Sequence, residues 1–230
     1  MIQRVDDDAP NFGSAARKIK KGQPVLRFKI ELPLEDAGRT VLVWRIIETP
    51  YDYTFWDLHV AIQDAMGWAD YHLHEFTVPT NPVGPGTIKL GIPIDEFDVP
   101  EIEIADGSVV PVTGHLEAIG ARGMLYSYDF GDGWRHWLKL EGGAVSDGGM
   151  YPRCVDGENA CPPEDCGGES GYFRVLDALE DPDDPEHEGT KTWLTNHTNA
   201  AWPYRATNFS PATVSFDDPA KRFAYAMSNS

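Results

Sequence analysis

Alternation of apolar and polar residues is the first regular pattern along the chain, and it covers residues 25–32. The apolar positions Leu26, Phe28, Ile30 and Leu32 are interleaved with Val25, Arg27, Lys29 and Glu31. A period of two predicts a half-buried strand. The turn sequence EDAGR then leads to VLVWRIIE, a run of β-branched and aromatic residues that favours a second strand. We therefore expect an antiparallel hairpin.

Helical spacing follows in the segment TFWDLHVAIQDAMGW. Its apolar positions recur every three or four residues, at Leu58, Ile62 and Met66. Thr54 and Asp57 have the spacing of a capping box, although the aspartate side chain is shorter than the usual glutamate. Gly67 suits the left-handed position after a helix. The pattern predicts a helix that starts after Thr54 and ends before Gly67.

Further elements are expected in the rest of the chain. Short strands are predicted at residues 71–78 and 87–92, and a helical turn at 113–120. Helices are predicted at residues 171–181, 184–197 and 217–229, the last two with Asp184 and Asp218 as N-caps before a proline. Residues 93–111 show no clear periodicity. Early strands and late helices, without βαβ alternation, indicate an α+β fold.

We expect one domain over residues 23–230, with an antiparallel or mixed sheet. A hairpin at about residues 124–140 would pack in it against several helices. Residues 1–22 are polar and aperiodic, which predicts a flexible N-terminal arm.

Charge and composition narrow the class of partner. The chain has 19 basic and 37 acidic residues and a net charge of −18. Because duplex DNA is bound largely by phosphate neutralisation, such a chain is a poor direct binder of nucleic acid. A protein or small-molecule partner is favoured. The basic run RKIKK in the arm could contact phosphate, or it is a solvated tail.

The sequence also predicts where the protein is located in the cell and whether it forms a dimer. The first residues lack the apolar stretch of a signal peptide, and no apolar run reaches the roughly 18 residues that cross a bilayer. We expect a cytoplasmic protein with no membrane contact, in which the odd count of three cysteines indicates thiols and not disulfides. The seven tryptophans and nine tyrosines leave room for a homodimer interface.

The segment YSYDFGDGWRHW concentrates chemical side chains in a predicted hairpin. With Asp132-Gly133 as a two-residue loop, Asp129 would face His136, whereas a three-residue loop would pair Asp129 with Arg135. An Asp129–His136 pair would be either a structural ion pair or an oriented base or metal ligand. Asp129 and His136 are therefore candidate catalytic residues, and Trp134 and Arg135 are candidate ligand-binding residues.

The cysteines are candidate metal ligands. Cys154, Cys161 and Cys166 have the spacing C-x6-C-x4-C, which differs from the C-x2-C of common zinc modules. Three thiolates and one histidine would complete a tetrahedral zinc shell, and the histidine would be His72, His74 or His136. The alternative is that the cysteines only pack a loop.

Two further pairs of polar residues invite a choice between chemistry and structure. Glu164 and Asp165 could present carboxylates into a cleft, and are then candidate catalytic residues, or they could cap the helix that follows. His72 and His74 would share a face of a strand and could bind a metal or another ligand, or pack against Trp68 and Phe76.

Three segments carry a family resemblance. They are YDFGDGWRHWLKLE, PPEDCGGESGYFRVLDAL and FWDLHVAIQDAMGWADYHLHEF, and they resemble the plasmid pRiA4b ORF-3-like family, which includes TnpR-like passenger proteins of insertion sequences. The resemblance runs from about Pro24 to the C-terminus. It implies one α+β domain and a link to plasmids and transposons, and it implies no particular activity.

Two functional hypotheses remain open from the sequence. The first is a non-catalytic binding or regulatory module that is associated with mobile elements. The second is a metal-dependent hydrolase or nuclease, in which a divalent ion activates water. Its site would be built from His72, His74, Asp129, His136, Glu164 and Asp165. No cofactor is certain, and zinc or another divalent metal is the candidate.

Overall fold

The computed structural model describes residues 13–93, 104–196 and 203–228. Within these ranges the main sheet has the strand order β11-β3-β2-β8-β7-β4-β5-β6, with β9 beside β2. Its strands are β2 (Pro24–Asp36), β3 (Arg39–Pro50), β4 (His74–Pro79), β5 (Thr87–Gly91), β6 (Ile104–Asp106), β7 (Met124–Tyr128), β8 (Trp134–Leu140), β9 (Ala144–Val145) and β11 (Arg153–Glu158). Only the β5–β6 pair among these is parallel. The expected α+β fold with a mixed sheet is confirmed.

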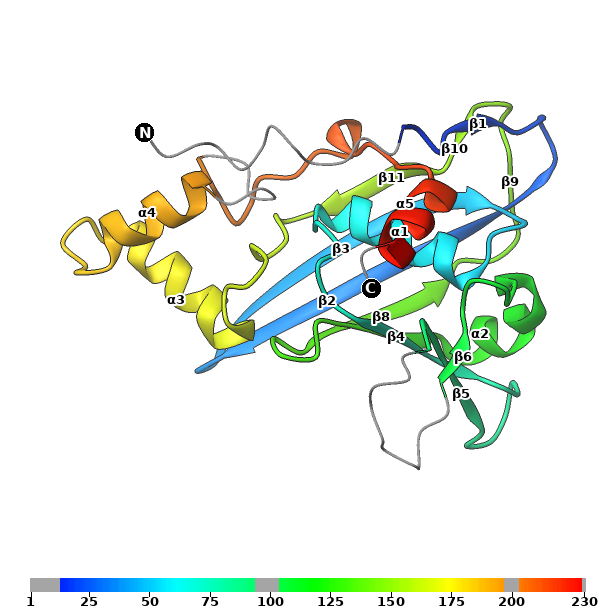
Figure 1. Ribbon diagram of the computed structural model, residues 1–230, viewed down its shortest axis with the longest axis horizontal. Helices are drawn as coiled ribbons and strands as arrows, with labels where there is room; N and C mark the ends of the chain where they lie inside the picture. Colours follow the sequence, from blue (N-terminus) through cyan, green and yellow to red (C-terminus); the bar gives the residue numbers. More distant parts are fainter. Residues whose placement is uncertain (1–12, 94–103, 197–202, 229–230) are drawn as a thin grey trace.

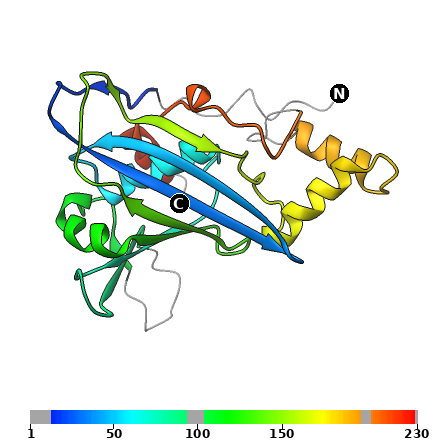
Figure 2. The ribbon, with the colours of Figure 1, turned by 180° about the vertical axis from the view of Figure 1, so that it is seen from behind.

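The helices lie on one face of the sheet and near both ends of its long strands. They are α1 (Phe55–Met66), α2 (Leu116–Arg122), α3 (Gly168–Glu180), α4 (His187–Asn196) and α5 (Pro219–Ser228), with short 3₁₀ segments at Val112–His115 and Pro211–Thr213. Figure 1 shows α1 and α5 over the long strands, and α3 and α4 near the tip of the β2–β3 hairpin. In Figure 2, seen from behind, β2, β3 and β8 have no helix in front of them. The core therefore lies between the sheet and α1.

The first hairpin supplies the two longest strands of the main sheet and confirms the prediction from the period-two pattern. Strands β2 and β3 pair continuously from Val25↔Pro50 to Asp36↔Arg39. Its alternate residues Leu26, Phe28, Ile30 and Leu32 are at most 3% exposed. The turn contains Ala37 and Gly38 with φ of 48° and 83°, the left-handed region that a two-residue hairpin turn requires.

Helix α1 starts and ends as the sequence predicts. The Thr54 hydroxyl accepts a hydrogen bond from the Asp57 N–H, and the Asp57 carboxylate accepts one from the Thr54 N–H at 2.9 Å. Both bonds of a capping box are thus present despite the shorter aspartate. Gly67 follows the helix with φ of 88°.

Removal of this cap has a predictable cost. Because Thr54→Ala leaves an N-terminal N–H of α1 without its acceptor, we expect a loss of about 1 kcal/mol in the free energy of unfolding. Thr54→Ser keeps the hydroxyl and should stay near the wild-type value. Urea denaturation of the three proteins measures this, and an equal loss in both variants would assign the effect to the methyl group instead.

The later helices are largely confirmed, with shifts at the starts of α3 and α4. Helix α3 begins at Gly168 and not at Gly171. The Asp218 carboxylate accepts a hydrogen bond from Ala220 N–H at 3.0 Å and α5 begins at Pro219, as predicted. Helix α4 instead begins at His187, because Asp184 belongs to the turn before it. The Asp184 carboxylate accepts from Glu186 N–H at 2.7 Å and pairs with Arg174. Of residues 93–111, positions 94–103 lie outside the described ranges.

The N-terminal segment is held to the body from Gly13 onward, in contrast to the arm expected over residues 1–22. The pair β1 (Arg17–Lys18) joins β10 (Met150–Tyr151) as a separate two-stranded sheet, and Ser14 bridges to Asp217. The basic run therefore starts in paired backbone, where Arg17 contacts Asp52. Residues 1–12 lie outside the described ranges. No helix in the described ranges combines the length and the apolarity that crossing a bilayer needs.

The predicted hairpin at 124–140 exists, but its expected register is wrong. Tyr126 pairs with His136 and Tyr128 with Trp134, so residues 129–133 form a longer loop than either alternative. Asp129 thus faces neither His136 nor Arg135. The residues Met124, Tyr126, Tyr128, Trp134, His136 and Leu138 share the buried face. The two-residue loop is excluded because it would place Trp134 and His136 on the face opposite to Tyr126 and Tyr128.

Candidate functional site

Three loops meet at one end of strands β4 and β7. They are the segment before β4, the loop 129–133 between β7 and β8, and the segment before α3. Asp129 N–H donates to Leu73 C=O at 3.0 Å, and Gly167 N–H donates to the Asp132 carboxylate at 3.1 Å. These bonds bring together residues that are more than thirty positions apart in the chain.

At this junction His72, Asp129 and Asp165 form a cluster, which we call the HDD centre. The His72 Nε2 atom lies 2.8 Å from Asp165 Oδ1 and 3.6 Å from Asp129 Oδ2. Each residue has one possible metal-ligand atom within 4.8 Å of those of the other two. Among the described residues, no other group of three or more histidine, cysteine or acidic side chains is this close. Its side chains are 31%, 8% and 55% exposed for His72, Asp129 and Asp165. The centre is thus open to solvent on one side.

Local backbone conformation aims the two carboxylates. Asp129 and Asp165 have φ of 51° and 57°, in the left-handed region that aspartate tolerates better than most residues. The Asp129 Oδ1 atom accepts hydrogen bonds from Gly131 N–H at 2.9 Å and Asp132 N–H at 3.2 Å. Its Oδ2 atom is therefore the one that faces His72. The loop holds this carboxylate in place before any ligand binds.

Glu164 lies beside the centre but is buried, and it does not cap α3, contrary to the capping alternative. Its carboxylate accepts hydrogen bonds from the Tyr128 hydroxyl and from Ala69 N–H at 2.8 Å. Burial raises the pKa of Glu164, and the hydrogen bonds from Tyr128 and Ala69 oppose that rise. The α3 N-cap is Gly167, which has no side chain to offer. Glu164 therefore ties the loop before α3 to the sheet.

His136 is separated from the carboxylates and enclosed in the core. Its Nδ1 atom lies 3.3 Å from Tyr126 C=O, and its ring meets the Trp68 ring edge-on at 5.2 Å. The Nε2 atom has no hydrogen-bond partner among the described residues. Burial lowers the pKa of His136 to about 3. It is a core histidine and not a member of the HDD centre.

His74 and His72 do not share a strand face, contrary to expectation, because β4 begins only at His74. The His74 ring stacks on the His59 ring at 3.5 Å. Burial lowers the pKa of His74 well below its ordinary value, and the neighbouring His59 lowers it further. His59, which the sequence pattern does not single out, bonds Tyr126 Oη at 2.8 Å and Asp70 Oδ1 at 2.9 Å.

The remaining candidates also lie outside the centre. Trp134 is 1% exposed in the core, and Arg135 is exposed on the opposite face of β8. The thiols of Cys154 and Cys166 face backbone acceptors, Asp156 C=O at 3.6 Å and Gly168 C=O at 3.8 Å. Burial raises the pKa of Cys154 to about 11 and that of Cys166 to about 12. In the described ranges the cysteines form no ligand cluster with a histidine.

Three exposed apolar residues flank the centre, and the sequence does not indicate that they belong to a site. Tyr71, Leu73 and Phe130 are 60%, 37% and 57% exposed, and each is a chain neighbour of His72 or Asp129. Their alternation with polar residues resembles ordinary strand patterning, so the sequence offers no signal that they surround a site.

The fold and the centre define a class, an α+β protein with one mixed sheet and a loop-built histidine–carboxylate cluster. The chain belongs to the plasmid pRiA4b ORF-3-like protein family, whose model matches residues 24–217. This confirms the family indicated by the three sequence motifs.

Two relatives cover most of the chain. It is 32% identical over 204 residues to the uncharacterized protein y4hQ of Sinorhizobium fredii (strain NBRC 101917 / NGR234), covering 87% of this chain and 94% of that protein. The crystal structure of MM3350, a protein of unknown function from Methanosarcina mazei Go1, is similar with a TM-score of 0.69 and 34% identity. That match covers 85% of this chain and 99% of the other. Both relatives thus span the fold that carries the centre.

Proposed function

We propose that this protein is a binding module whose ligand is a divalent cation held at the HDD centre. The observation that carries the proposal is the convergence of His72, Asp129 and Asp165 from three separate loops, with ligand atoms within 4.8 Å of one another. One imidazole and two carboxylates suit zinc or manganese. A cation would lie between the His72 Nε2 atom and the carboxylate oxygens of Asp129 and Asp165.

The wider role follows from the surface around the centre. The net charge of −18 favours a protein or small-molecule partner over nucleic acid. Tyr71, Leu73 and Phe130 offer exposed apolar area beside the cation, and such area is typical of contact surfaces. In this proposal the bound ion fixes the three loops, so that the module presents this surface to its partner in a plasmid- or transposon-associated process. A homodimer would be one form of that contact.

Titration calorimetry with zinc chloride and manganese chloride tests the cation site. We expect one saturable site in the wild-type protein. The variants His72→Ala and Asp165→Asn should weaken it by at least the roughly 10- to 100-fold that follows loss of an outer-shell partner. Asp129 is not the residue to change first, because its carboxylate also holds the loop 129–133.

The matched control is Asp183→Asn, an exposed aspartate outside the three loops with the same change of charge. It should bind like the wild type. If Asp183→Asn and Asp165→Asn weaken binding equally, the effect is one of net charge, and the HDD centre is not the site.

A second function, metal-dependent hydrolysis, is favoured by the openness of the centre. Three protein ligands leave coordination positions for water, as in catalytic sites, and Asp165 is 55% exposed. The test is hydrolysis of bis(p-nitrophenyl) phosphate by the zinc- or manganese-loaded protein. Activity that disappears in His72→Ala would support the hydrolase, whereas cation binding without activity would support the binding module.

A further inference from the structure

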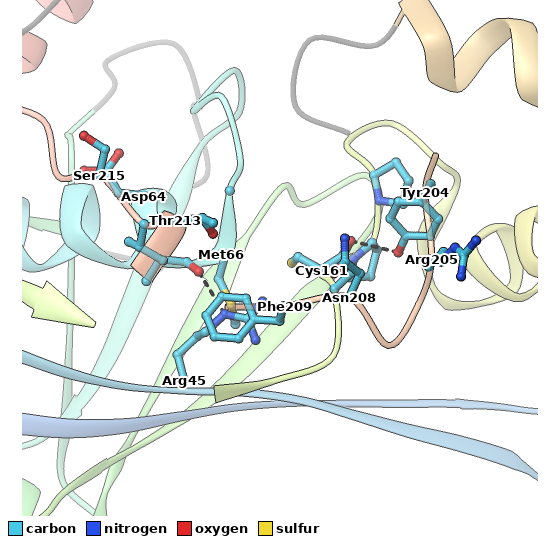
Figure 3. Close-up of a pocket in the computed structure, with 16 residues that line it drawn as sticks. Arg45, Asp64, Met66, Cys161, Tyr204, Arg205, Asn208, Phe209, Thr213 and Ser215 are labelled. Atoms are coloured by element: carbon cyan, nitrogen blue, oxygen red, sulfur yellow. Dashed lines mark hydrogen bonds between the residues drawn. The ribbon is translucent and has the colours of Figure 1, made fainter. Parts of the chain in front are cut away.

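A hollow lies between the C-terminal end of α1, β3, the segment after β11 and the segment before α5. Its volume is about 190 Å³. Figure 3 shows Arg45 at its floor beneath Phe209, with Cys161 and Asn208 along one side. Met66, Pro162 and Val214 add apolar wall. We call this hollow the Arg45 pocket.

Arg45 stands where the alternation of β3 calls for an apolar residue. Its neighbours on the same face, Val43 and Ile47, are fully buried, and Arg45 itself is 1% exposed. An isolated charge at such a position is costly unless it is paired. Arg45 therefore lowers the stability of the fold at this inward position unless its charge has a role.

Three hydrogen bonds fix the guanidinium but leave part of it free. Nε donates to Ala65 C=O at 2.9 Å, and Nη1 donates to Trp44 C=O at 2.8 Å and to Glu158 C=O at 3.0 Å. The Phe209 ring covers the guanidinium, with the carbon of the group 3.5 Å from the ring centroid. Among the described residues, no hydrogen bond or ion pair uses Nη2. This donor is the one left for the pocket.

No carboxylate of the described ranges neutralises Arg45. Asp64 lines the same pocket, but Figure 3 places it away from Arg45, and it pairs with Arg222 at 2.7 Å. The Cys161 thiol faces the same space, and burial raises its pKa, which keeps it uncharged. The other cation of the lining, Arg205, points outward in Figure 3. The floor of the pocket therefore carries a single, uncompensated positive charge.

A glycine on the neighbouring strand makes room for the Phe209 ring that covers the guanidinium. Gly157 on β11 pairs with Arg45, and a Cβ atom there would meet Phe209 at 2.5 Å and the Arg45 side chain at 2.9 Å. Only a glycine leaves room for the aromatic ring to lie on the guanidinium. The arrangement of Gly157, Arg45 and Phe209 thus holds the guanidinium under the aromatic ring, with the Nη2 donor left unused by the described residues.

We propose that the Arg45 pocket binds a small organic anion, with a carboxylate head on Arg45 Nη2 and an apolar body against Phe209 and Met66. One cation matches one negative charge, which favours a carboxylate over a doubly charged phosphate. The apolar wall favours an organic body over a bare inorganic ion. This site is independent of the cation site proposed above.

The test is an NMR titration of the ¹⁵N-labelled full-length protein with sodium butyrate at neutral pH, with sodium chloride and sodium phosphate as reference salts. Butyrate should give saturable shifts at pocket residues at concentrations up to about 10 mM, which covers a millimolar dissociation constant. Arg45→Met should weaken binding by about tenfold or more, because a hydrogen bond to a charged group is lost.

Arg45→Met also frees three backbone carbonyls and could fail to fold, so an exposed residue supplies a second variant. Asn208→Asp places a negative charge beside the pocket and should weaken butyrate binding a few-fold. Asn81→Asp, exposed on the β4–β5 loop, has the same change of charge and should bind like the wild type. Absence of saturable shifts, equal shifts with chloride or phosphate, or equal weakening in both aspartate variants would each overturn the proposal.

Discussion

Replacing Gly171 by alanine should destabilise the protein by about 2–4 kcal/mol and weaken cation binding, although Gly171 offers no ligand. A Cβ atom at this position would meet the Cys166 carbonyl oxygen at 1.8 Å and its carbon at 2.7 Å. Both are backbone atoms, so the clash cannot be relieved by rotating a side chain. Overpacking of this kind commonly costs about 1–3 kcal/mol and occasionally more. Because Cys166 follows Asp165, the displaced loop would also move a carboxylate of the HDD centre.

Gly189 provides the matched control in another helix. It lies in α4, and a Cβ atom at this position would meet no other atom within 4 Å. Alanine there should raise stability by about 0.5–1 kcal/mol, since glycine is the more flexible residue in the unfolded chain. Urea denaturation and calorimetry with zinc chloride compare the two variants. A Gly171→Ala protein with wild-type stability would show that the loop before α3 adapts freely, and that its position is not tied to the helix start.

Acidification should unfold this protein through its buried histidines, with a loss of several kcal/mol in stability. His136 has its pKa lowered by burial to about 3, whereas an unfolded histidine has a pKa of about 6.5. Between these values the unfolded state binds the proton and the folded state does not. Stability is therefore fully present above about pH 6.5 and is lost as the pH falls toward 3. His74, whose pKa is lowered as well, adds to the same trend.

The contribution of His136 can be isolated with His136→Leu. This variant removes the titrating group and keeps an apolar side chain against Trp68. Urea denaturation at several pH values between about 7 and 4 gives the slope of unfolding free energy against pH, which should be smaller in the variant. At pH 7 the difference between the two proteins reports packing together with the lost contact between His136 Nδ1 and Tyr126 C=O. Equal slopes would mean that His136 is hydrated or paired in the folded protein, in conflict with its enclosed position.

The HDD centre shows what local sequence patterns can and cannot predict about a site. His72, Asp129 and Asp165 are each candidates on residue type, and each lies in one of the three motifs that carry the family resemblance. Their meeting could not be predicted, because it depends on the five-residue loop 129–133 and on the contact between Asp132 and Gly167. A short turn satisfies the local signal of GDG, whereas in the structure Tyr128 packs against Trp68 and pairs with Trp134, which leaves the longer loop.

Elements whose signals are local can be predicted from the sequence. Alternation placed the β2–β3 hairpin, and the Thr54–Asp57 cap and Gly67 bounded α1, because hydrogen bonds and side-chain directions within a few residues specify them. Which polar residues are buried, and which of them lie together, follows instead from the folding of distant segments against one another. This folding enclosed His136 and His74, tied Glu164 to Tyr128, and left Arg45 uncompensated in its pocket. Those outcomes depend on contacts between residues far apart in the chain, and burial of a charge is a property of its surroundings and not of its neighbours in sequence.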